Sequence, residues 1–169
     1  VPKKLKIGVM VNMSEFLYSD LKLKKKIDLL FKKKNKSKIS FVRIAAHYKE
    51  FTSALEMCRL LQLKGYLVCI NLMQISEQSN ENINILLKRL SKIKPDVLYF
   101  ADSLGSLRPD NIIKIVKNLR LSWNGPIGIH AHDNLEEALS NTLTAIKTGV
   151  TWIDSTITGM GRGPGNLQT

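Results

Sequence analysis

The sequence predicts an α/β fold, and within that class a partial (β/α)8 TIM barrel with about six parallel βα units. Short apolar segments alternate with amphipathic ones at intervals of roughly 25 to 30 residues, the pattern of parallel strands joined by helical crossovers. Polar residues follow nearly every apolar segment. In a barrel all strand ends meet at one mouth, whereas an open sheet needs such residues only where its strand order reverses, so their distribution favours the barrel.

Each expected strand is a run of apolar residues that is hydrophobic on both faces and bounded by turn residues. The runs are 6–12, 39–46, 66–73, 97–101, 127–131 and 150–155. No GxGxxG motif follows the first run, and the chain has no GxxxxGK[ST] motif. An open nucleotide-binding sheet would therefore lack its phosphate cradle.

Helices are expected between these strands, at 20–34, 50–63, 80–92, 109–121 and 135–148. The first has apolar residues at helical spacing, namely Leu23, Ile27, Leu30 and Phe31. Gly65 and Gly149 are the expected stops of the second and fifth helices, and Pro95 closes the third. Pro109 opens the fourth, at a position where a missing amide proton costs nothing.

Composition bounds the function. The chain has 169 residues, of which 44% are apolar, so we expect one partial barrel domain over residues 1–169. The formal net charge is +12, but much of the lysine lies within 22–38, on the outward face of an expected helix. No helix-turn-helix or zinc-finger spacing accompanies it. We expect a solvated lysine-rich face and no nucleic-acid partner.

Cys58 and Cys69 lie within apolar segments and lack metal-site spacing, which suits a reducing compartment. No apolar run reaches the roughly 18 residues needed to span a bilayer. We therefore expect a cytoplasmic protein that does not enter the membrane. Because the chain begins at Val1 and stops at Thr169 just after a Gly-rich turn, we also expect it to be a piece of a longer protein.

His130 and His132 are the clearest candidates for chemistry. They occupy alternate positions at the end of the expected strand 127–131, and Asp133 and Asn134 follow at once. Side chains alternate along a strand, so both imidazoles point to the same side, close enough to share one metal ion. From spacing alone, a histidine pair that only packs or hydrogen-bonds explains the pattern equally well.

Longer motifs resemble a known superfamily. The segment 128–134, GIHAHDN, and the downstream segment 154–166, DSTITGMGRGPGN, resemble the closing third of the DRE-TIM metallolyases. That superfamily includes HMG-CoA lyase, isopropylmalate synthase and the 4-hydroxy-2-oxovalerate aldolases. The segments 41–47, FVRIAAH, and 99–105, YFADSLG, resemble the aldolases most. The resemblance covers essentially the whole chain and implies strands 3 through 8 of a barrel.

This resemblance implies a metal site. It makes His130 and His132 ligands of a catalytic divalent cation and Asn166 a further ligand. Mn²⁺ is the expected metal, with Mg²⁺, Co²⁺ or Zn²⁺ as alternatives. Asn166 could instead cap a following helix, because Asn is a favoured N-cap. The glycines around it are expected to allow close backbone approach and positive φ, namely Gly159, Gly161, Gly163 and Gly165.

The resemblance also implies substrate contacts. Ser103 matches a residue that holds the substrate carboxylate, and we assign Asp102 beside it to substrate binding. His47 ends a strand at the same mouth, and we assign it to substrate contact or proton transfer. Ser103 could instead cap a turn, and Asp102 could pin its loop.

The implied reaction cleaves or forms a carbon-carbon bond through the metal-bound enolate of a 2-oxo acid such as pyruvate. An acyl-CoA-dependent synthase or lyase of the same superfamily is the alternative. The aldolases further imply a homodimer and an acylating aldehyde dehydrogenase as partners.

The chain lacks the first strand of these enzymes, Asp-x-Thr-x-Arg-Asp-Gly, which supplies another metal ligand and an arginine. A non-catalytic barrel remnant that acts as a binding or assembly module is therefore the second hypothesis.

Overall fold

The structure, a computed structural model, describes residues 5–18, 21–90, 93–161, 163 and 165–169. Its strands are β1 (Ile7–Asn12), β2 (Ile39–Ala46), β3 (Leu67–Leu72), β4 (Val97–Asp102), β5 (Ile127–Ala131) and β6 (Trp152–Ile153). Its α-helices are α1 (Met13–Leu17), α2 (Leu23–Leu30), α3 (Phe51–Leu63), α4 (Asn80–Leu90), α5 (Pro109–Arg120) and α6 (Ala138–Lys147). Short 3-10 turns occur at Lys34–Lys36, Tyr48–Glu50, Ile75–Glu77 and Ile157–Gly159.

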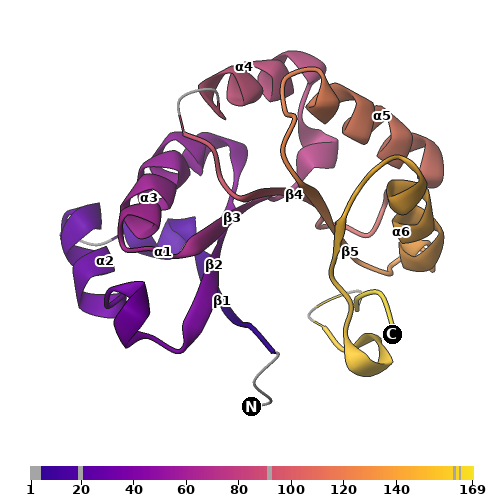
Figure 1. Cartoon of the computed structure of the whole chain (residues 1–169). Helices are drawn as coiled ribbons and strands as arrows, with labels where there is room; N and C mark the ends of the chain where they lie inside the picture. The colour runs from indigo at the N-terminus through magenta and orange to yellow at the C-terminus, as the bar shows by residue number, and fades with distance from the viewer. Residues whose placement is uncertain (1–4, 19–20, 91–92, 162, 164) are drawn as a thin grey trace.

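The strands form one curved sheet that makes half of a barrel. They lie in the order β1-β2-β3-β4-β5-β6, and each neighbouring pair is parallel. The helices cover the outer, convex side of the sheet, and the concave side is open (Figure 1). An order that follows the chain without reversal is that of a barrel and not of a doubly wound sheet. The predicted partial TIM barrel is confirmed.

Alternation along the strands separates two layers of side chains. On β2, Val42 and Ile44 belong to the main core between the sheet and the helices. The residues that alternate with them face the concave side, where Phe41 packs against a small second cluster made of Cys69, Val97 and Tyr99. Gly128 on β5 makes room for this cluster, because a Cβ there would lie 2.5 Å from the Tyr99 ring. The inward layer is thus apolar at the base, which leaves polar chemistry to the strand ends.

The helix expected at 20–34 differs from the prediction. Asp20 lies outside the described residues, and α2 ends at Leu30, which is 66% exposed although it was expected to face inward. Phe31 leaves the helix at φ −119° and packs edge-on against Tyr66, with ring centroids 5.8 Å apart. Lys26 is buried and donates a hydrogen bond to the Phe16 carbonyl at the end of α1. Ile27 is buried and Leu23 packs against the core as expected, so the helix departs from the prediction only in its last turn.

The other elements differ mainly at their ends. The expected helix 135–148 begins only at Ala138, because Glu136 has φ 59° and Asp133 accepts a hydrogen bond from the Ala138 amide at 2.9 Å. The expected strand 150–155 shrinks to β6, which pairs with β5 over two residues. Residues 91–92, the expected end of the helix 80–92, lie outside the described part of the chain. Helix α1 and the 3-10 turns were not expected.

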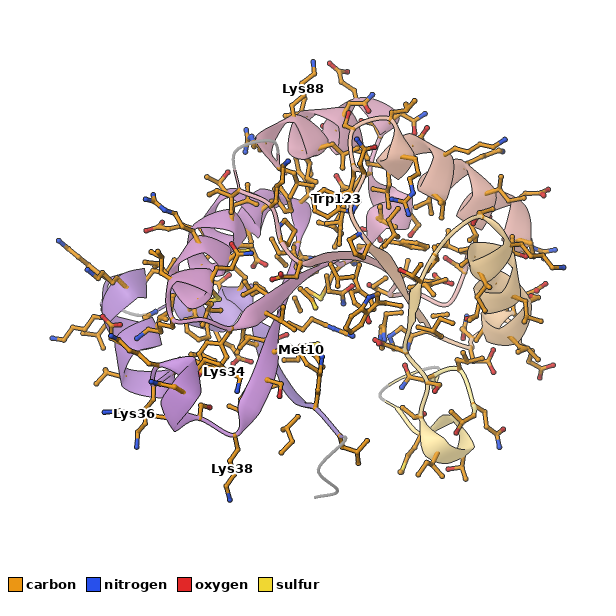
Figure 2. The ribbon with its side chains drawn as sticks, in the orientation of Figure 1. Met10, Lys34, Lys36, Lys38, Lys88 and Trp123 are labelled. Carbon is orange, nitrogen blue, oxygen red and sulfur yellow. The ribbon has the colours of Figure 1, made fainter. Side chains whose placement is uncertain are left out.

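The structure also bears on the charge and the cysteines. Lys36, Lys38 and Lys88 point outward from the body of the half-barrel (Figure 2). Cys58 and Cys69 are free and buried, and burial raises the pKa of their thiols to about 12 and about 11. Within the described residues, none of the helices is long and apolar enough to cross a membrane.

Candidate active site

A cavity of about 510 Å³ opens on the concave face at the carboxyl ends of the strands. Its lining is Met10, Asn12, Ala45, Asn71, Met73, Ala101, Ser103, His130, His132 and Asn166. Met10 projects from β1 into the opening of the half-barrel (Figure 2). Ala45 and Ala101 stand on the inward face of β2 and β4, where larger side chains would fill this space. The strand ends therefore enclose room for a small molecule.

The two histidines are each held through the same ring nitrogen. His130 Nδ1 lies 2.8 Å from the Asp154 carboxylate, and His132 Nδ1 lies 2.7 Å from the Gly165 carbonyl oxygen. A carbonyl or carboxylate oxygen can only accept, so each Nδ1 carries the proton and donates it. When such a ring carries no second proton, its Nε2 keeps a lone pair. The rings are 4.9 Å apart and nearly perpendicular, and both line the cavity, as alternation along β5 requires.

Asp154 is held from its other side by Arg43. The guanidinium of Arg43, on β2, forms a bidentate ion pair with the carboxylate, with Nη2 2.7 Å from Oδ1. It also lies 3.9 Å from the centre of the Tyr99 ring, a favourable position for a cation. Burial raises the pKa of Asp154, but the hydrogen bonds from His130 and Arg43 outweigh it and bring the pKa to about 2. At neutral pH Asp154 is therefore an ionised acceptor that orients the His130 ring.

The Gly-rich loop brings Asn166 beside His132. The two residues form an isolated antiparallel bridge, and the Leu167 amide donates to the Ala131 carbonyl at 3.2 Å. Asn166 Nδ2 donates to the Met160 carbonyl at 3.0 Å, which leaves its buried Oδ1 without a hydrogen-bond partner. A Cβ at Gly161 would come within 1.9 Å of that Nδ2, so only glycine fits there. Three further glycines of the loop have positive φ as expected, namely Gly159, Gly163 and Gly165.

These atoms fit a divalent cation. Two imidazole nitrogens with free lone pairs and one unpartnered amide oxygen line one cavity, a donor set that Mn²⁺, Co²⁺ and Zn²⁺ accept. In the described part of the chain, no group of three or more His, Cys, Asp or Glu side chains could hold a metal ion by itself. The described residues therefore offer part of a coordination shell.

The structure brings Ser103 into the cavity but leaves Asp102 and His47 outside its lining. Ser103 Oγ accepts a hydrogen bond from the Gln74 amide at 3.0 Å, so its hydroxyl proton remains available to a ligand. Asp102 is fully buried, which raises its pKa, and its oxygens accept from the Ser106 and Leu107 amides at 3.0 and 3.1 Å. It pins the loop after β4, the alternative already visible in the sequence.

His47 lies at the end of β2, where its backbone amide donates to Glu50 Oε2 at 3.0 Å. It precedes the 3-10 turn that leads into α3, a position that organises the start of this helix.

Sequence reasoning missed the part that Arg43 plays. The signal was present, because Arg43 is the single charged residue in the apolar run 39–46 and alternates with residues that face the helices. What the sequence could not supply was its partner, since Asp154 lies 111 positions away.

Substituting Gly161 tests the link between the loop and the expected metal ligands. We expect Gly161→Ala to displace the Asn166 carboxamide and weaken Mn²⁺ binding by the full-length protein about tenfold, because the new Cβ overlaps Nδ2. Isothermal titration calorimetry measures the effect. Gly163→Ala is the control in the same loop, since its Cβ meets no atom within 4 Å. An equal loss in both variants would mean that backbone strain, and not Asn166, sets the affinity.

A half-barrel whose strand ends gather paired histidines and an asparagine around one cavity is the architecture of a TIM-barrel protein with its site at the carboxyl ends of the strands. The chain belongs to the HMGL-like family, whose model matches residues 3–169.

Among curated relatives, the chain is similar to the 4-hydroxy-2-oxovalerate aldolases of Bacillus thuringiensis, with 35% identity over 128 residues, and Brevibacillus brevis, with 34% over 131 residues. These matches cover 76% and 78% of the chain but only 38% of each relative, so the chain spans about two fifths of their length.

Among solved structures, the N-terminal domain of a candidate aldolase from Bacteroides vulgatus matches 98% of the chain and 53% of its own, at 32% identity and a TM-score of 0.84. Bacillus subtilis HMG-CoA lyase matches 77% of the chain and 53% of its own, at 17% identity and a TM-score of 0.70. The carboxyl transferase domain of Rhizobium etli pyruvate carboxylase, solved with pyruvate, matches 97% of the chain and 29% of its own, at 16% identity and a TM-score of 0.79. The last two establish the fold alone.

Proposed function

We propose that the full-length protein is a divalent-metal-dependent aldolase that cleaves a 4-hydroxy-2-oxo acid into pyruvate and an aldehyde. The observation that carries the proposal is the hydrogen bonding of the histidine pair, since the contacts of Nδ1 with Asp154 and Gly165 leave both Nε2 atoms free at one cavity. The names of the curated relatives support the choice of reaction and substrate.

In this reaction the bond between C3 and C4 of the substrate breaks. The 4-hydroxyl group gives up its proton as C4 becomes the aldehyde carbon, and C3 takes up a proton to form the methyl group of pyruvate. A cation held by His130, His132 and Asn166 supplies Lewis acidity next to the 2-oxo group. We propose Mn²⁺ as this cation.

The other residues of the chain bind and orient the substrate. The Ser103 hydroxyl donates a hydrogen bond to the substrate carboxylate, and Asp102 contributes by fixing the loop that carries Ser103. Asp154 and Arg43 hold the His130 ring in place. His47, at the end of β2, is proposed for substrate contact or proton transfer. A cytoplasmic location, a homodimer and an acylating aldehyde dehydrogenase that takes up the aldehyde complete the proposal for the full-length protein.

Metal removal tests the proposal directly. We expect full-length protein treated with a chelator to stop releasing pyruvate from 4-hydroxy-2-oxovalerate, and added Mn²⁺ to restore the release, because the carbonyl loses and regains its Lewis acid. Pyruvate is followed with lactate dehydrogenase and NADH. Release that persists in excess chelator would rule out the metal mechanism. The absence of release with each of Mn²⁺, Mg²⁺, Co²⁺ and Zn²⁺ would rule out the aldolase activity.

A further inference from the structure

Asn71 stands out among the polar side chains of the cavity. It lies on β3, is 4% exposed, and its Oδ1 has no hydrogen-bond partner. Its polar neighbours in the cavity are each anchored, Asn12 through Glu15 at 3.0 Å and Ser103 through the Gln74 amide. Asn71 is thus a buried carboxamide that the described residues leave without a partner.

Such a group is unfavourable unless a ligand completes it. Burying a carbonyl oxygen without a hydrogen bond costs about 1–3 kcal/mol, and an apolar side chain of the same shape would avoid that cost. Its neighbours on β3, Ile70 and Leu72, are both apolar and buried. Because Asn71 also lines the cavity, a ligand bound there is the candidate partner for its carboxamide.

The chemistry of Oδ1 restricts what this contact can be. An amide oxygen accepts hydrogen bonds and cannot donate. The substrate of the proposed reaction has three kinds of polar group, and its carboxylate and 2-oxo oxygens are also acceptors. Only its hydroxyl group can donate. Asn71 Oδ1 and the 4-hydroxyl group are therefore complementary.

The placement of Asn71 fits this pairing. Asn71 on β3 pairs with Tyr99 of β4, two residues before Ala101, and Ala101 pairs with His130 of β5. Two strand spacings put Asn71 roughly 10 Å from β5, which carries the two histidines. A five-carbon acid with a hydrogen bond at each end is long enough to bridge that distance. Ala101 is small, so the path between the two sides is open.

We propose that Asn71 is a specificity-determining residue whose Oδ1 accepts a hydrogen bond from the 4-hydroxyl group of the substrate. This inference rests on the proposed function for the identity of the substrate. It assigns the two ends of the cavity, with the 2-oxo acid group at the histidines and the hydroxylated carbon at β3.

The test compares two ligands that differ by this hydroxyl group, in the full-length protein with Mn²⁺. For Asn71→Leu we expect kcat/KM for 4-hydroxy-2-oxovalerate to fall about tenfold, the worth of one hydrogen bond. The inhibition constant of 2-oxovalerate, which lacks the hydroxyl, should stay the same or decrease, because leucine removes the unpartnered oxygen. Equal changes for both acids, or no change for either, would overturn the proposal.

Thr142→Val is the matched control. Thr142 is also buried with an unpartnered hydroxyl oxygen, but it lies on α6 and does not line the cavity. We expect both substitutions to keep or raise the melting temperature, and only Asn71→Leu to change the preference between the acids. Should Asn71→Leu fail to fold, Asn71→Ala provides the same comparison.

Failure of the proposed reaction is distinguishable from failure of this inference. If the wild-type protein cleaves no hydroxy-oxo acid, calorimetry on the Mn²⁺-loaded protein measures the dissociation constants of the two acids and so tests the role of Asn71 by binding alone. A preference for the hydroxylated acid that disappears in Asn71→Leu supports the role of Asn71 without the reaction. A wild-type protein that binds both acids equally refutes it.

Discussion

Replacing His130 by alanine in the full-length protein is expected to slow pyruvate release from 4-hydroxy-2-oxovalerate by about a thousandfold. The substitution removes one of the Nε2 atoms that face the cavity, and a Lewis acid contributes several kcal/mol of transition-state stabilisation, at 1.36 kcal/mol for each factor of ten. Initial rates over a Mn²⁺ titration measure the loss, and calorimetry measures the metal dissociation constant.

Asp154→Asn is the matched comparison, because it keeps the imidazole and removes the negative charge that accepts its Nδ1 proton and pairs with Arg43. We expect it to weaken metal binding about 10- to 100-fold, an effect that saturating Mn²⁺ partly overcomes. A His130→Ala protein with the wild-type rate and an unchanged Mn²⁺ dissociation constant would show that His130 is not a ligand.

Asp154→Ala is expected to have the largest effect on stability, a loss of about 3 kcal/mol in the free energy of unfolding. Arg43 and Asp154 are largely buried, with 14% and 21% of their side chains exposed, and removal of one partner leaves the other charge uncompensated. Urea unfolding of the full-length protein, followed by circular dichroism, measures the change.

A double-mutant cycle separates the pair from its surroundings. Arg43→Met with Asp154→Leu should be less destabilised than the sum of the single variants, because no unpaired charge remains. Strict additivity would contradict a coupled pair.

The pH dependence of stability has a definite sign. The pKa of Asp154 in the folded state, about 2, lies below the unfolded value of about 3.9, so its contribution is present above pH 4 and lost as the pH falls toward 2.

The strands were predictable from the sequence because each is an apolar run whose ends carry turn residues. β2 begins and ends where expected, at Ile39–Ala46, and so does β5, at Ile127–Ala131. The early end of the helix expected at 20–34 was not predictable, since the packing of Phe31 on Tyr66 is a tertiary contact that overrides helical spacing. β6 shortened for a related reason, because its pairing depends on neighbours that local sequence does not specify.

The parts of the candidate site that depend on alternation along a strand or on a sequence motif were predictable. His130 and His132 share a side of β5 because every second side chain does, and the four loop glycines indicated a tight turn. The sequence could not show that Asp102 turns its oxygens to the loop amides, since an aspartate after a strand serves either purpose. Nor could it show that Asn71 lacks a partner, which depends on everything around it.

The ion pair between Arg43 and Asp154 also couples the proposed metal site to folding. These residues are 111 positions apart, so their contact closes a long loop and forms only when the strands between them are assembled. That contact orients the His130 ring. Both Nε2 atoms are therefore positioned to bind a cation only after the half-barrel has formed. By linkage, a cation that binds only the folded form raises the stability of the whole sheet, including β2 on its far side.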